Sequence, residues 1–163
     1  MSPYATAGWE TFFVAEVGAA AALTGLLFVA VSINLTKVLA FPQLPGRAAE
    51  SLMMLAAVLV VASLGLIPGQ SRVALGAEIL ATAALVWIYP MALQKRAVVP
   101  EVPLRWTVTR AITHQVGTVP LVVCGVSLLL GAGGGLYWLA AGALLSFAAA
   151  ILNSWVLLVE IQR

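Results

Sequence analysis

The sequence predicts an all-α integral membrane protein, a bundle of five transmembrane helices with the N-terminus outside and the C-terminus inside. The first observation is composition, because 63% of the 163 residues are hydrophobic and only 9% are charged, against about 25% charged residues in ordinary soluble domains. The second is that the hydrophobic residues gather in five long runs, most of them close to the ~20 residues that a spanning helix needs. The third is a one-sided distribution of the basic residues along these runs.

The first predicted span covers residues 11–36 and is interrupted only by Glu16. At this length it can cross the bilayer with some tilt. No Lys or Arg stands before it, so it lacks the positive segment of a secretory signal peptide, and we expect it to be a permanent helix. A loop from Lys37 to Arg47 follows, because two prolines and a glycine in it disfavour helix.

The second predicted span, residues 51–67, is the shortest and lies near the lower limit for crossing the bilayer. The alternative is a re-entrant segment, which would leave four spans and conflict with the charge distribution. A Pro-Gly turn at residues 68–71 ends this span. The third span covers residues 73–94, with Glu78 inside it and a proline, Pro90, near its end. A proline is tolerated there when a neighbouring group satisfies the carbonyl that it leaves free.

The remaining spans are predicted at residues 106–130 and 136–159. A polar connection with two prolines, residues 95–105, precedes the fourth span. A glycine-rich segment, residues 131–135, makes a tight turn between the fourth and fifth spans. Residues 1–163 are therefore expected to form a single transmembrane domain.

The orientation follows from the positive-inside rule, which places Lys and Arg of short loops on the cytoplasmic side. With the N-terminus outside, the inner segments hold Lys37, Arg47, Lys95, Arg96, Arg105, Arg110 and Arg163. The outer segments hold only Arg72. We expect a multi-pass protein of the plasma membrane, in a bacterium the inner membrane, with the lipid bilayer as its main partner. Basic residues placed beside apolar runs do not form a nucleic-acid-binding patch.

Several catalytic and metal-binding chemistries are excluded by missing residue types. The chain has no Asp, one His and one Cys, which rules out the usual zinc sites, a thiol redox pair and an aspartyl intramembrane protease. No metalloprotease, nucleotide-binding or serine-hydrolase motif occurs. We therefore expect no enzymatic activity, no metal and no cofactor.

Two carboxylates, Glu16 and Glu78, stand inside predicted spans, where each costs roughly 2.5 to 3.5 kcal/mol. One interpretation is structural, with Glu78 paired to Arg72 and Glu16 reaching the membrane interface or bonding to a neighbouring helix. The other is a cation-binding or proton-accepting pair near the outer surface.

Helical phase divides the first span into two faces. Glu16 and Asn34 are 18 residues apart, five helical turns, so they share one face with only apolar residues between them. Between these two residues that face, which we call the dry face, has no polar side chain and does not resemble a pore lining. The opposite face carries small residues that allow close helix packing, against either a helix of this chain or another subunit. These residues are Gly18, Ala22, Gly25 and Ser32.

Two further polar features lie near the predicted inner side. Ser146, Asn153 and Glu160 are spaced by seven residues and form a polar seam that should face other helices, as packing contacts or as a pathway lining. His114 is the only histidine, the residue type whose unperturbed pKa lies closest to neutral. It is either a packing residue or a proton relay.

The segments Phe12–Val14, Gly25–Leu35, Leu44–Glu50 and Gly65–Gln70 resemble a pattern of small uncharacterised bacterial multi-pass membrane proteins. The resemblance covers about the first 70 residues and implies no activity. Two functions are consistent with the sequence. The first is a homo-oligomeric ion or small-solute channel or transporter, with Glu16 and Glu78 at the outer mouth and His114, Asn34 and Asn153 towards the inner side. The second is an accessory or scaffolding subunit of a larger membrane complex.

Overall fold

The computed structural model describes residues 2–41, 44–96 and 104–162, with side chains described for 2–41, 44–89, 108 and 111–155. The described part is all-α. Its helices are α1 (Glu10–Ile33), α2 (Leu35–Ala40), α3 (Leu44–Gly65), α4 (Arg72–Arg96), α5 (Leu104–Leu130) and α6 (Leu136–Gln162). Five of these, all except the short α2, are long and apolar enough to cross a membrane. The predicted class, an all-α membrane protein with five spans, is confirmed.

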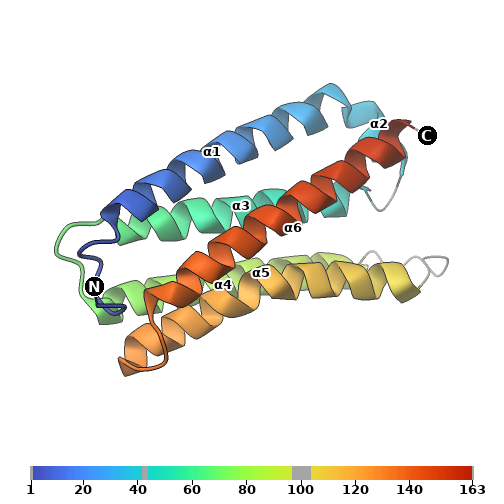
Figure 1. Cartoon of the computed structure of the whole chain (residues 1–163). Helices are drawn as coiled ribbons and strands as arrows, with labels where there is room; N and C mark the ends of the chain where they lie inside the picture. The colour runs from blue at the N-terminus through green and yellow to red at the C-terminus, as the bar shows by residue number, and fades with distance from the viewer. Residues whose placement is uncertain (1, 42–43, 97–103, 163) are drawn as a thin grey trace.

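Four of the long helices form a ring, and the fifth lies outside it. α3 packs against α4, α4 against α5, α5 against α6, and α6 against α3. α1 packs along α3 and barely contacts α6, an arrangement visible in Figure 1. Only 17% of the α1 span is buried, against 56% of the α3 span. α3 is thus the central helix of the molecule, and α1 is the most exposed.

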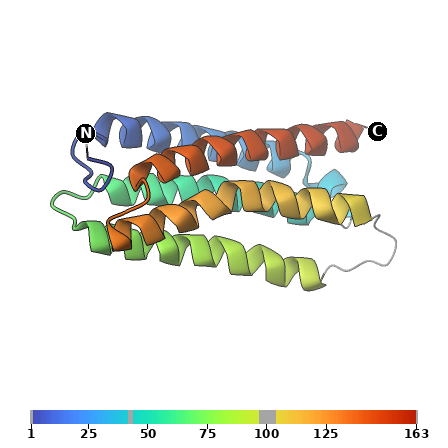
Figure 2. The same ribbon diagram turned by 60° about the horizontal axis from the view of Figure 1, so that its bottom comes forward.

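The two termini lie at opposite ends of the bundle, as Figure 2 shows. We call these the N-terminal end, with residues 66–71 and 131–135, and the C-terminal end, with α2. Five antiparallel spans place the termini on opposite membrane sides, so the charge distribution predicts that the C-terminal end is cytoplasmic.

α3 begins at Leu44, earlier than the expected start of the second span at Ser51. Pro45 and Gly46, which the sequence analysis assigned to a loop, belong to the first turn of this helix. Proline is tolerated in a first turn because the backbone N–H groups there have no intrahelical acceptor. The longer helix is long and apolar enough to cross the membrane, and it includes Glu50.

α1 ends at Ile33, inside the predicted first span, and Asn34 is its C-terminal capping residue. The side-chain amide of Asn34 donates to the carbonyl of Ala30 at 3.0 Å, and its backbone leaves the helical region (φ −105°, ψ 19°). Such a side chain competes with the backbone for hydrogen bonds and favours a break. The short α2 then packs through Val38 against Leu44 and Ala48 of α3.

The N-terminal end of the bundle is closed by hydrogen bonds around Ser127. Its buried hydroxyl accepts from the N–H of Gly135 at 2.7 Å and donates to the carbonyl of Ala132. Gly135 has φ +53°, and a Cβ there would collide with the carbonyl of Pro3, so glycine is required. That same Pro3 carbonyl accepts from the N–H of Leu136 at 2.8 Å. The segment before α1 is therefore fixed against the start of α6.

Candidate functional site

Glu16 occupies the buried face of α1. Its side chain is only 6% exposed, so it does not reach the surface. One turn before it, Phe13 lies against Gly65 of α3, and about one turn after it, Ala20 packs with apolar residues of α3 and α6. The carboxylate oxygen Oε2 has no hydrogen-bond partner in the described part of the chain. Glu16 is thus a buried acidic group with an unsatisfied oxygen in apolar surroundings.

Glu78 has different surroundings. It is partly buried and accepts a hydrogen bond from the side-chain amide of Gln70. Arg72 donates instead to the carbonyl of Leu128, at 3.2 Å, near the C-terminus of α5. The expected Glu78–Arg72 pair is replaced by these two contacts, because the start of α4 lies beside the end of α5, where helix carbonyls attract a cation. Gln70 is a partner that the sequence analysis missed.

The two carboxylates do not share one site within the chain. Glu16 lies on α1 and Glu78 on α4, two helices that pack against α3 rather than against each other. A common outer mouth built from both residues would therefore require a second copy of the chain.

His114 is buried in α5 and contacts α4. Its Nε2 atom lies 3.1 Å from the carbonyl oxygen of Val86. Because a carbonyl can only accept, Nε2 carries the hydrogen in this contact. The carbonyl of His114 in turn accepts from the hydroxyl of Thr118 at 2.9 Å. These contacts are those of a histidine that joins two helices.

Glu50 is a second buried carboxylate, which the sequence analysis missed. It is only 2% exposed on α3, one turn before Met54, which lies close to Gly117 of α5. Its neighbour Ser51 is fully buried and donates to the carbonyl of Arg47 at 3.1 Å. The signal that could have revealed Glu50 is the compatibility of Pro45 with a first helical turn, which extends the span past Glu50.

Two of the three polar residues of the seam predicted on α6 have described side chains. Ser146 is buried in the centre of the bundle, near Gly117 of α5. Asn153 is only half-buried and sits beside Ser154 on α6. The side chain of Glu160, the third residue of the predicted seam, lies outside the described residues.

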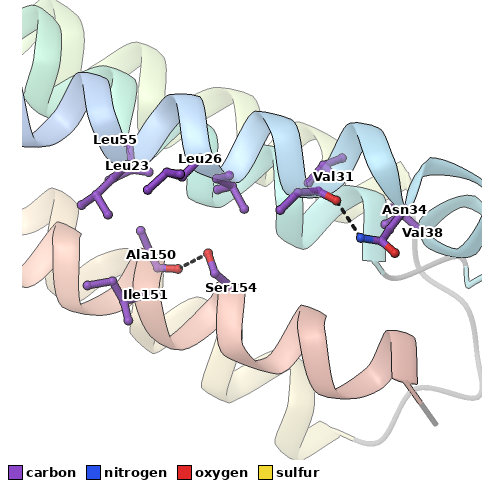
Figure 3. A pocket seen from close by; sticks show the side chains of 11 residues that line it. Leu23, Leu26, Val31, Asn34, Val38, Leu55, Ala150, Ile151 and Ser154 are labelled. Carbon is purple, nitrogen blue, oxygen red and sulfur yellow. Dashed lines mark hydrogen bonds between the residues drawn. The ribbon is translucent and has the colours of Figure 1, made fainter.

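An apolar groove lies between α1 and α6, with Leu55 of α3 as its floor. Its volume is about 250 Å³. In Figure 3 the side chains of the two helices face each other across it. Asn34 and Ser154 are its polar residues, and both lie towards the C-terminal end of the bundle. The apolar lining residues are Leu23, Leu26, Leu27, Ala30, Val31, Val38, Leu55, Ala150 and Ile151. The dry face predicted for the first span thus supplies part of this lining.

The small-residue stripe of α1 faces away from the bundle. Gly18, Ala22, Gly25 and Ser32 are all exposed. A Cβ added at Gly18 or Gly25 would meet nothing within 4 Å. The stripe therefore packs against no helix in the part of the chain that the structure describes, and lipid or another chain can be its neighbour.

The buried carboxylates and the buried histidine lie at two separate levels of the bundle. Glu16 is nearer the N-terminal end, whereas Glu50 and His114 are nearer the C-terminal end. Between them, Ala20, Val58 and Ala143 pack into an apolar layer. Among the described residues, no three His, Cys, Asp or Glu side chains form a group that could hold a metal ion.

Comparison with protein-family models, curated proteins and solved structures finds no match for this chain. The resemblance of the first 70 or so residues to small bacterial membrane proteins stays a prediction. The helices themselves define the class: this is a polytopic membrane protein whose spans contact the lipid bilayer.

Proposed function

We propose that the protein moves protons or small cations across the membrane as a homo-oligomer and has no enzymatic activity. The observation that carries this proposal is the buried carboxylate of Glu16 with its unpartnered oxygen. An acidic group in the hydrocarbon region is costly, and such groups usually mark ion or proton pathways. A carboxylate oxygen without a protein partner is available to a proton or a cation.

The position of α1 supports the oligomeric form of the proposal. An apolar cluster of α1, α3 and α6 lies between Glu16 and the buried groups Glu50 and His114, so these three groups form no continuous polar path in the described part of one bundle. Glu16 lies on α1, the candidate span with the smallest buried share. The exposed face of α1, with its small-residue stripe, leaves room for a second copy of the chain, and a displacement of α1 away from α3 would expose Glu16 to it.

Flux measurements on reconstituted protein test this function. Purified full-length protein in liposomes should conduct protons or K⁺ above the level of empty liposomes. Glu16→Gln, which keeps the side-chain size and removes the exchangeable charge, should abolish most of that flux. Glu10→Gln is the matched control, because Glu10 is exposed at the start of the same helix. Flux equal to that of empty liposomes, or flux unchanged by Glu16→Gln, would refute the proposal.

A second candidate, an accessory or scaffolding subunit, is favoured by the uncovered stripe of α1. Glycines with open space around them let another helix approach closely in a membrane. If this function is correct, Gly18→Leu should leave the isolated chain folded and weaken its recovery with a larger membrane complex. A protein that shows flux but purifies as a homo-oligomer alone would exclude this candidate.

A further inference from the structure

We propose that the groove between α1 and α6 binds one acyl chain of an anionic phospholipid, with the lipid headgroup beside Lys37. The groove lies along the membrane-spanning stretches of both helices and continues past the end of α1 to Asn34 and Val38. Its walls continue to the surface, because Leu26 is 68% exposed and Ile151 is 54% exposed. A molecule therefore enters from the side, out of the bilayer.

The dimensions of the groove match one chain within one leaflet. From Leu23 to Asn34 the helix rises about 16 Å, at ~1.5 Å per residue. This is close to half of the ~30 Å hydrocarbon core of a bilayer. An apolar cavity of about 150 Å³ holds the six carbons of benzene. On that scale, the 250 Å³ of the groove accommodate a chain segment of about ten carbons.

The lining of the groove also argues against water as its occupant. Water requires polar partners, whereas nearly all of the lining is apolar. The two polar lining groups, Asn34 and Ser154, already donate to carbonyls of their own helices.

The charge at the C-terminal end of the groove is complementary to a phosphate. Lys37 is exposed and follows Asn34 by three residues, one turn along. The N–H of Val38 donates to the carbonyl of Asn34 at 2.9 Å, so the turn that carries Lys37 is helical. Asn34 and Val38 line the groove, which places Lys37 next to its end. Basic residues at this depth attract anionic headgroups, above all on the expected cytoplasmic side.

Native mass spectrometry of the full chain, released from mild detergent with added lipid, tests the proposal. Wild-type protein should retain one phosphatidylglycerol per chain and prefer it to phosphatidylcholine with the same acyl chains. Ala30→Phe places a ring in the groove and should remove the retained lipid. Ala21→Phe is the control, since Ala21 is exposed on the same helix and does not line the groove.

Lys37→Gln separates the headgroup contact from the acyl-chain contact. This surface variant should reduce the preference for phosphatidylglycerol by about fivefold and leave phosphatidylcholine binding unchanged. Equal lipid retention by Ala30→Phe and Ala21→Phe would overturn the assignment of the groove. An unchanged preference in Lys37→Gln would overturn the headgroup assignment. Loss of a dimer instead of a lipid in Ala30→Phe would assign the groove to a second copy and likewise overturn the proposal.

Discussion

The Nε2 atom of His114 lies 3.1 Å from the carbonyl oxygen of Val86, the backbone group that Pro90 deprives of its helical donor. In a regular helix this carbonyl would accept from the N–H of the residue four positions later. Residue 90 is a proline and has no N–H. His114 of α5 thus donates the hydrogen bond that residue 90 of α4 cannot donate. A neighbouring group was expected to satisfy the carbonyl left free by Pro90, and His114 is that group.

A double-mutant cycle tests this relationship. His114→Ala should lower the free energy of unfolding by about 1 to 3 kcal/mol, because it leaves a buried carbonyl unsatisfied. In a Pro90→Ala background the N–H of residue 90 satisfies that carbonyl, so the same substitution should cost clearly less. Thermal or denaturant unfolding in detergent micelles gives both values. An equal loss in the two backgrounds would show that His114 serves another purpose, such as proton relay.

The crossing of α4 and α5 should be sensitive to any added side-chain volume. A Cβ on Gly125 would lie 2.9 Å from the carbonyl oxygen of Gly76, and one on Gly76 would lie 3.0 Å from that of Gly125. Gly125→Val should therefore destabilise the protein by about 1 to 3 kcal/mol. Gly25→Val on α1, where the space is open, should leave the melting temperature nearly unchanged. Similar melting temperatures for both variants would argue against this close packing.

The closure at the N-terminal end depends on one hydroxyl group. Ser127→Ala removes the acceptor of the Gly135 N–H and the donor to the Ala132 carbonyl. We expect a loss of about 1 to 3 kcal/mol and faster hydrogen exchange at residues 131–136. Ser63→Ala serves as the control, since Ser63 is exposed and bonds only to the carbonyl of Leu59 in its own helix. Unchanged exchange in Ser127→Ala would contradict this role.

Membrane orientation is a prediction from the charge distribution alone. A reporter fused after Arg163 should be active on the cytoplasmic side, and one inserted at Gln70 should be active outside. Replacing Lys37 and Arg47 by Gln should weaken this preference, because both belong to a predicted inner loop. The reverse pair of reporter activities would show that the N-terminus is inside.

The class of fold was predictable because membrane spans can be identified in a sequence by their length and hydrophobicity. The start of α3 was not, since Pro45 and Gly46 disfavour helix in general but are acceptable in a first turn. Because the predicted span began at Ser51, Glu50 was placed outside it, and its burial was not predicted.

Which side of α1 packs inward was only partly predictable. The helix is apolar all the way round, so hydrophobicity does not distinguish its faces. Helical phase grouped Glu16 with Asn34, and the structure turns that face towards α3 and α6. The small residues of the opposite face suggested packing, but none of the described helix residues covers them. The partners of Glu78 and Arg72 were not predictable in the same way. Glu78 bonds to Gln70 in a loop and Arg72 bonds to the end of α5, and the residue pattern of α4 alone carries no information about either position.

The hydrogen bond between Pro3 and Leu136 has a consequence for biosynthesis. The N-terminal segment emerges from the ribosome first, yet its partner at the start of α6 appears only after the four preceding spans have been made. Insertion can therefore proceed helix by helix, but the hydrogen bond that closes this end of the bundle forms last. A chain arrested before residue 136 would expose its N-terminal segment to proteases outside the membrane core, and the completed chain would protect it.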